Sequence, residues 1–161
     1  MGSVDSQQQQ WVTNEFATAD KDKALIVALH HPVYSFDDHH SGSPNMADVL
    51  QHAINESRRV PNLVLTAHVH NYQRIEKNIL DDAPTPFFVS GNGGYYHLHN
   101  LTAGKGDIDD QTGAQLMFGD DKQHGYLTIT VDKDENITKK ADEFSYTATA
   151  QFLKDNVTAS L

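Results

Sequence analysis

The alternation of apolar and polar stretches along the chain predicts a protein that combines helices with short, buried strands. Residues 7–19 place apolar side chains at helical spacing and end before a charged turn, which predicts a first helix. Ser43, followed by Pro44 at the first helical position, resembles a helix start, and the apolar stripe after it has a helical period. A second helix is therefore expected to run to about Ser57.

Two apolar runs have the length of strands. KALIVALHH, residues 23–31, is apolar on both faces, which predicts a central strand in a sheet that is covered on both sides. PNLVLTA, residues 61–67, predicts a second buried strand. Because the second helix lies between these runs, the three elements predict a parallel crossover unit.

The rest of the chain predicts further strands and one long loop. Strands are expected from the alternating patterns of YQRIEKNIL, PFFVSG and HGYLTITVD, with NITKKADEFS as an edge strand. Residues 100–121, rich in Gly and Asp, have little periodicity and predict a surface loop. The final TATAQFLKDNVTASL is expected to form a short helix or to fray. The fold class is therefore α/β.

Composition excludes several kinds of protein. The 161 residues suffice for one domain, and the formal net charge of -10 argues against nucleic acid as the main partner. Without cysteine, any metal must be held by nitrogen and oxygen ligands. No apolar run has the length of a membrane span, so we expect a soluble protein without a membrane partner. Residues 1–6 look like a cloning remnant or linker, and an extracellular or periplasmic compartment stays open.

Histidine is unusually abundant. Of ten histidines, eight form four close pairs: His30/His31, His39/His40, His68/His70 and His97/His99. Pairs dispersed along the chain favour a convergent site over a histidine-rich surface.

The pair His68 and His70 directly follows a predicted strand. Residues two apart in an extended chain project to the same side, so both imidazoles can point at one locus. His30 ends the other predicted strand, and the ends of neighbouring parallel strands meet at one edge of a sheet. Three imidazoles there predict a metal half-site, whereas the alternative is a set of hydrogen-bonded structural histidines.

These residues carry a family resemblance. VALHHPVYS resembles the V-x-x-H segment, and AHVHNYQR the G-H-x-H segment, of the calcineurin-like metallophosphoesterases, closest to their purple acid phosphatase branch. The resemblance implies a centre of two metal ions, drawn from Fe, Zn or Mn. It implies that His30 and His68 ligate one metal and that His70 ligates the other. Ala67 stands where the family usually has glycine.

The resemblance covers about residues 7–145 and only the C-terminal half of the family's fold, with residues 146–161 as a tail. It implies a partial four-layer α/β/β/α sandwich with a mixed sheet. The family's N-terminal motifs, which supply a bridging aspartate and an asparagine ligand, have no match in the sequence. Asp37-Asp38-His39 has the letters of D-x-H but lies in the wrong order, so we interpret it as coincidence. At most one metal ion is therefore expected in this chain.

The other histidines have weaker interpretations. His39 and His40 follow at the interval where purple acid phosphatases place histidines that face the phosphate, which makes them catalytic candidates that bind phosphoryl oxygens or protonate the leaving group. The alternative is a solvated loop pair. His31 is expected to point away from the site, in a supporting or packing role. His97 and His99 either line the substrate mouth or are merely exposed.

The turn GNGG, Gly91–Gly94, follows a predicted strand. Glycine there permits a tight turn and close approach of the backbone to its neighbours. A phosphate-binding nest is a weaker interpretation, because no helix follows.

Together these features predict the C-terminal part of a phosphoric ester hydrolase. Its expected partners are a phosphate ester substrate and the missing N-terminal half, with self-association of the surfaces that this half would cover. The chain alone is expected to have little or no activity. Two alternatives stay open: a metal-binding or structural module without catalysis, and one piece of a split enzyme.

Overall fold

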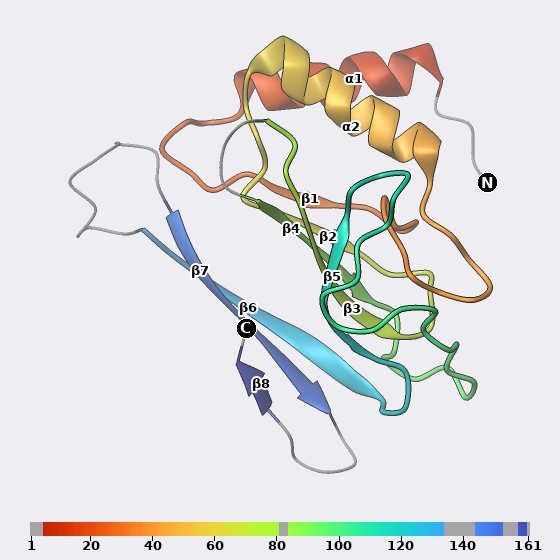
Figure 1. Ribbon diagram of the computed structural model, residues 1–161. Coiled ribbons are helices and arrows are strands. Elements are labelled where there is room, and N and C mark those ends of the chain that lie inside the picture. The colour runs from red at the N-terminus through yellow and green to blue at the C-terminus, as the bar shows by residue number, and fades with distance from the viewer. Residues whose placement is uncertain (1–4, 81–83, 134–143, 153–157, 161) are drawn as a thin grey trace.

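The computed structural model describes residues 5–80, 84–133, 144–152 and 158–160. Two helices lie together on one side of the molecule (Figure 1). α1 spans Ser6–Thr18 and α2 spans Pro44–Ser57, so both predicted helices are confirmed. The backbone N–H of Gln8 donates to the Asp5 side chain at the start of α1, and Ser43 caps α2 in the same way, which satisfies donors that a helix leaves free. Neither described helix is long and apolar enough to cross a membrane.

A mixed five-stranded sheet lies beneath the helices, and this confirms the α/β class. Its strand order is β1-β2-β4-β3-β5, in which β1, β2 and β4 are parallel and β3 is antiparallel to both of its neighbours. The strands span Ile26–Ala28 (β1), Leu63–Thr66 (β2), Tyr72–Lys77 (β3), Thr85–Ser90 (β4) and Gln115–Asp120 (β5). The predicted crossover of strand, α2 and parallel strand is therefore present.

Three expectations about strands are wrong. β1 has three residues and lies at the edge of the sheet, where Ile26 is 39% exposed, so residues 23–31 do not form a covered central strand. The predicted loop at 100–121 contains β5, whose pairing with β3 is a long-range contact that local periodicity does not reveal. The described residues of the C-terminal segment, 147–152 and 158–160, form strands, where we expected a helix or fraying.

A second sheet covers the face of the first sheet that is opposite the helices (Figure 1). It consists of β6 (Gly125–Lys133), β7 (Phe144–Phe152) and β8 (Thr158–Ser160), all antiparallel. β7 crosses the domain boundary that we predicted at residue 145. The described part of NITKKADEFS belongs to β7, and residues 136–143 lie outside the described residues. The helices and two sheets thus form three layers, as a partial α/β/β/α sandwich requires.

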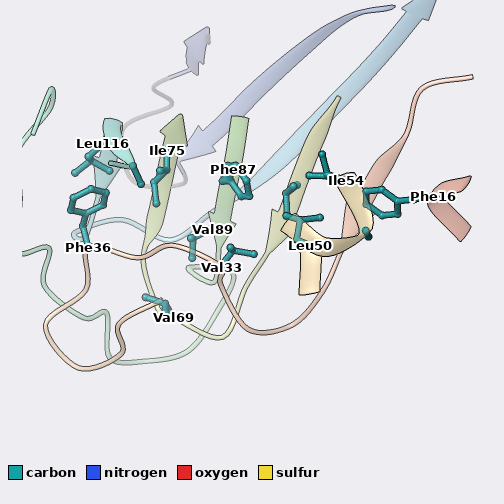
Figure 2. Close-up of a cluster of buried hydrophobic side chains, with 13 residues drawn as sticks. Phe16, Val33, Phe36, Leu50, Ile54, Val69, Ile75, Phe87, Val89 and Leu116 are labelled. Carbon is teal, nitrogen blue, oxygen red and sulfur yellow. The ribbon is translucent and has the colours of Figure 1, made fainter. Parts of the chain in front are cut away.

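The core lies on both faces of the five-stranded sheet because successive residues of a strand alternate between its faces. Phe87 and Val89 of β4 pack in one cluster with Ile54 of α2 (Figure 2). Phe88 packs on the other face, against Leu127 and Ile129 of the second sheet. This packing fixes the strands whose ends carry the histidines.

Candidate metal centre

The histidines begin where β1 and β2 end, and backbone hydrogen bonds hold these ends together. The N–H of Leu29 donates to the carbonyl oxygen of Leu65 at 3.0 Å. One step further, the N–H of Ala67 donates to the carbonyl oxygen of His30 at 3.1 Å. The segments that carry His30 and His68 therefore leave the sheet side by side.

Three imidazoles gather at this point: His30, His31 and His68, which we call the imidazole group. Nε2 of His30 lies 3.0 Å from Nδ1 of His68, and the two ring centroids are 4.9 Å apart. The ring of His31 lies 4.3 Å from that of His68. The expectation that His31 points away is therefore wrong, because the chain bends after β1 and is no longer extended there.

The segment after β2 is also not extended. His68 has φ = 59°, a left-handed conformation that costs a non-glycine residue about 1 kcal/mol or more. The N–H of Val69 then donates to the carbonyl oxygen of Ala67 at 2.6 Å, and the N–H of Asn71 donates to that of Val69 at 2.9 Å. These tight turns show that His68 and His70 do not lie on an extended strand end, contrary to our prediction.

His70 instead faces other partners. Its ring centroid lies 4.7 Å from that of His99 and 4.0 Å from that of Tyr95. Its Nδ1 is buried without a hydrogen-bond partner among the described residues. The structure thus brings His30 and His68 together and places His70 beside them, against a second group.

This second group consists of Asp37, His39 and His99, which we call the carboxylate group. Each offers one ligand atom, and these atoms lie within 4.8 Å of one another, a spacing that a metal ion can bridge. Nδ1 of His99 is 3.4 Å from Oδ2 of Asp37, which is longer than a hydrogen bond. His99, which the sequence left undecided, is therefore part of the site, whereas His97 is exposed.

Asp37 organises the loop that carries the two catalytic candidates. Its side chain is fully buried, and Oδ1 accepts the backbone N–H groups of His39 at 2.9 Å and His40 at 2.7 Å. Oδ2 accepts a hydrogen bond from Nδ2 of Asn71 at 2.9 Å. Sequence reasoning dismissed Asp37 as a coincidental motif. The side chain of an Asp in a turn often accepts hydrogen bonds from the backbone N–H groups that follow it. This turn signal could have revealed the role of Asp37.

His39 and His40 lie between the two groups. The His39 ring stacks on that of His99 with centroids 4.7 Å apart, and its Nδ1 pairs with the carboxylate of Asp38. The His40 ring lies 4.9 Å from that of His68 and 5.4 Å from that of His99. Both residues therefore border the cluster, and their catalytic roles stay predictions.

Buried amides connect this loop to the sheet. Oε1 of Gln73, on β3, accepts the backbone N–H of Phe36 at 2.8 Å. Nε2 of Gln73 donates to Oδ1 of Asn71 at 2.9 Å, and Asn71 in turn donates to Asp37. A strand of the core thus fixes the position of the carboxylate.

The close approach that we predicted for the GNGG turn is confirmed at Gly91. A Cβ on Gly91 would lie 1.9 Å from the carbonyl oxygen of Val69, the residue between His68 and His70. Only glycine therefore allows the end of β4 to support the histidine loop at this distance.

The two groups differ in electrostatics. Burial lowers the pKa of His68, and the neighbouring imidazoles of His31, His40 and His30 lower it further. Burial and His99 lower the pKa of His70. The hydrogen bond that the His39 ring donates to the carboxylate of Asp38 raises the pKa of the exposed His39. The neutral form, which binds metals, is therefore favoured at His68 and His70.

The imidazole group brings two ring nitrogen atoms close together. A tetrahedral ion with bonds of about 2.0 to 2.1 Å holds two nitrogen ligands about 3.3 Å apart, close to the 3.0 Å between His30 Nε2 and His68 Nδ1. Asp37 accepts three hydrogen bonds, and hydrogen-bonded carboxylates of this kind also serve as metal ligands. The imidazole group contains no carboxylate that could bridge two ions.

No protein-family model matches the chain, and no curated protein matches it. Solved structures do resemble it. GAP50, the anchor in the inner membrane complex of Plasmodium, superposes with a TM-score of 0.57 at 16% identity over 96% of this chain and 42% of its own. PhoD superposes with a TM-score of 0.53 at 14% identity over 98% of this chain and 35% of its own.

At such low identity the likeness shows the fold alone. The likeness to both structures agrees with the layered α/β fold described above. The chain spans less than half the length of either neighbour.

Proposed function

We propose that this chain is the histidine-bearing part of a metal-dependent phosphoric ester hydrolase and that its imidazole group binds one divalent ion. The observation that supports this most directly is the 3.0 Å separation of His30 Nε2 and His68 Nδ1, which come from the ends of two adjacent parallel strands. Two neutral imidazoles can share one proton at this distance, and a cation can replace that proton. The lowered pKa of His68 favours the replacement, because less proton competition must be overcome.

The chain's own residues then have separate tasks. His30 and His68 hold the ion, and His70 lies toward the carboxylate group, where a second ion of a complete centre would be bound. When bound, the metal supplies positive charge that neutralises the phosphoryl oxygens. His39, whose pKa is raised by Asp38, donates a hydrogen bond to a phosphoryl oxygen or a proton to the leaving group, with His40 as the neighbouring candidate.

We propose that turnover also requires the remainder of a longer protein. The imidazole group lacks a bridging carboxylate, and the chain matches only 42% and 35% of its two structural neighbours. A preceding half would supply that carboxylate. The chain alone should hydrolyse phosphate esters little or not at all.

Zinc titration by calorimetry tests the metal site. We expect one ion per chain, and replacing His30 or His68 by Ala should weaken binding by about 100-fold or more. His52→Ala is the matched control, because His52 is exposed on α2 and should leave affinity unchanged. If no divalent ion binds, or if the double variant binds as the wild type does, the proposal fails.

Hydrolysis of p-nitrophenyl phosphate tests whether turnover requires a preceding half in addition to this chain. With Zn, Mn or Fe, the chain alone should give the rate of the metal alone, and addition of a preceding half that carries the carboxylate motifs should restore turnover. Turnover by the isolated chain would show that its own residues complete the centre.

A second function is favoured by the likeness to GAP50. That protein is described as an anchor, and it shares this fold with a TM-score of 0.57. The same histidines would then serve a metal-binding interaction module without catalysis. A zinc site that survives in the complex with the preceding half, with no hydrolysis of any phosphate ester, would favour this function.

A further inference from the structure

Two tyrosines extend the histidine cluster out to solvent. Tyr95 and Tyr96 follow the GNGG turn after β4, and they are 47% and 77% exposed. The Tyr95 ring lies 4.0 Å from that of His70, and the Tyr96 ring lies 5.0 Å from that of Tyr95. Aromatic rings therefore run continuously from the interior of the site to its surface.

The backbone beneath these rings is fixed to the site on several sides. Nε2 of His124 lies 2.7 Å from the carbonyl oxygen of Tyr95, at hydrogen-bond distance. The N–H of His99, beyond the tyrosines, donates to the carbonyl oxygen of His70 at 3.0 Å. Before them, Gly91 lies against Val69. The backbone thus holds both tyrosines beside the histidines although both residues are exposed.

This exposure has no structural role that the described residues reveal. Burying a tyrosine ring stabilises a fold, so a ring that remains 77% exposed contributes little to it. Planar ligands, in contrast, stack on exposed aromatic rings, because every flat ring system offers a π-face. Such a contact adds affinity that offsets the long-range repulsion between a protein of net charge -10 and an anionic phosphate ester.

We propose that Tyr95 and Tyr96 form a platform for the planar aromatic group of a phosphate monoester whose phosphate lies at the histidine cluster. This inference rests on the function proposed above and adds the class of substrate. Aryl phosphates and nucleotides share the chemistry of a flat ring joined to a phosphate, and both should bind more tightly than an alkyl phosphate. Stacking on one aromatic side chain contributes about 1 to 3 kcal/mol, which corresponds to roughly 5- to 150-fold in affinity.

Calorimetry on the zinc-loaded chain tests the platform with phenyl phosphate, AMP and methyl phosphate as probes. Phenyl phosphate should bind at least about 5-fold more tightly than methyl phosphate. Tyr96→Ala should reduce this ratio toward one, whereas Tyr96→Phe should keep it. Tyr126→Ala is the matched control, because Tyr126 on β6 is 56% exposed and lies outside the cluster. Tighter binding of AMP than of phenyl phosphate would identify a nucleotide, and the reverse an aryl ester.

The experiments give different results if the platform proposal is wrong and if the proposed metal site is wrong. A chain that binds zinc but binds phenyl phosphate and methyl phosphate equally, or that responds alike to Tyr96→Ala and Tyr126→Ala, overturns the platform alone. A chain that binds no zinc overturns the proposed function. In that case saturation-transfer NMR on the metal-free chain decides the platform: contact of the phenyl phosphate ring that Tyr96→Ala removes supports it, and absence of such contact overturns it.

Discussion

The imidazole group and the carboxylate group adjoin each other, yet different forces hold them. The carboxylate group is built around the buried Asp37, which accepts three hydrogen bonds and is connected through Asn71 to β3. The imidazole group has no such anchor: its rings contact one another, and His68 adopts a left-handed conformation. Asp37 therefore supports its loop through hydrogen bonds, whereas the imidazole group is arranged at a cost to stability, as expected of a binding site.

The largest effect should come from removing the support. Asp37→Ala leaves two backbone N–H groups and the Asn71 amide without an acceptor, so the free energy of unfolding should fall by about 3 kcal/mol in urea denaturation. Asp37→Asn keeps one acceptor oxygen and should lose less. Asp38→Ala, at the exposed neighbouring carboxylate, should have a much smaller effect. Equal losses at Asp37 and Asp38 would refute the supporting role.

A somewhat smaller effect is expected where β4 supports the histidine loop. Gly91→Ala places a methyl group where the carbonyl oxygen of Val69 lies, so the loop must shift, and we expect a loss of about 2 to 3 kcal/mol together with weaker zinc binding. Gly93→Ala is the control, since its Cβ would have the carbonyl oxygen of Gly125 as its nearest neighbour at 3.9 Å. Urea denaturation and zinc titration of both variants would measure the difference. Unchanged zinc affinity in a folded Gly91→Ala protein would contradict this coupling.

The cost at the imidazole group can be measured directly. His68→Gly and His68→Ala both remove the imidazole, but only glycine relieves the left-handed strain at this position. The Gly variant should therefore be more stable than the Ala variant by about 1 kcal/mol, and neither should retain zinc at the imidazole group. If the two variants unfold at the same urea concentration, His68 is not strained.

The smallest expected effect is a difference in pKa between His68 and His70 on one side and His39 on the other. In NMR titrations of the metal-free chain, His68 and His70 should titrate below pH 6.5 and His39 above it. The lowered pKa values of His68 and His70 mean that the unfolded chain binds more protons, so stability falls as the pH drops through 6.5. The raised pKa of His39 acts in the opposite direction: its contribution is complete below pH 6.5 and is lost as the pH rises through the raised value. If His68 and His39 titrate with the same pKa, the predicted difference between them is wrong.

Local patterns sufficed for the helices, because caps and periodicity are encoded within one segment. Ser43 and Pro44 place the start of α2 correctly, and the apolar run before Thr66 places β2. The apolar run at residues 23–31 wrongly predicted a central strand at β1. Whether a strand is central or at the edge depends on which other strands pair with it. β5 was missed for the same reason.

The site shows the same division. The sequence by itself indicated that His30 and His68 would follow parallel strands, because the helix between those strands sets their direction, and the structure shows that the two strands are neighbours. Only the tertiary structure decided that His70 faces His99, that Asp37 is buried and supports the loop of His39, and that tyrosine rings adjoin the cluster. These contacts join loops that are distant in sequence, and their geometry depends on turns such as the left-handed one at His68 and on close approaches such as that of Gly91 to Val69. Spacing along the chain does not predict these turns or these close approaches, because both form only when the loops pack against each other.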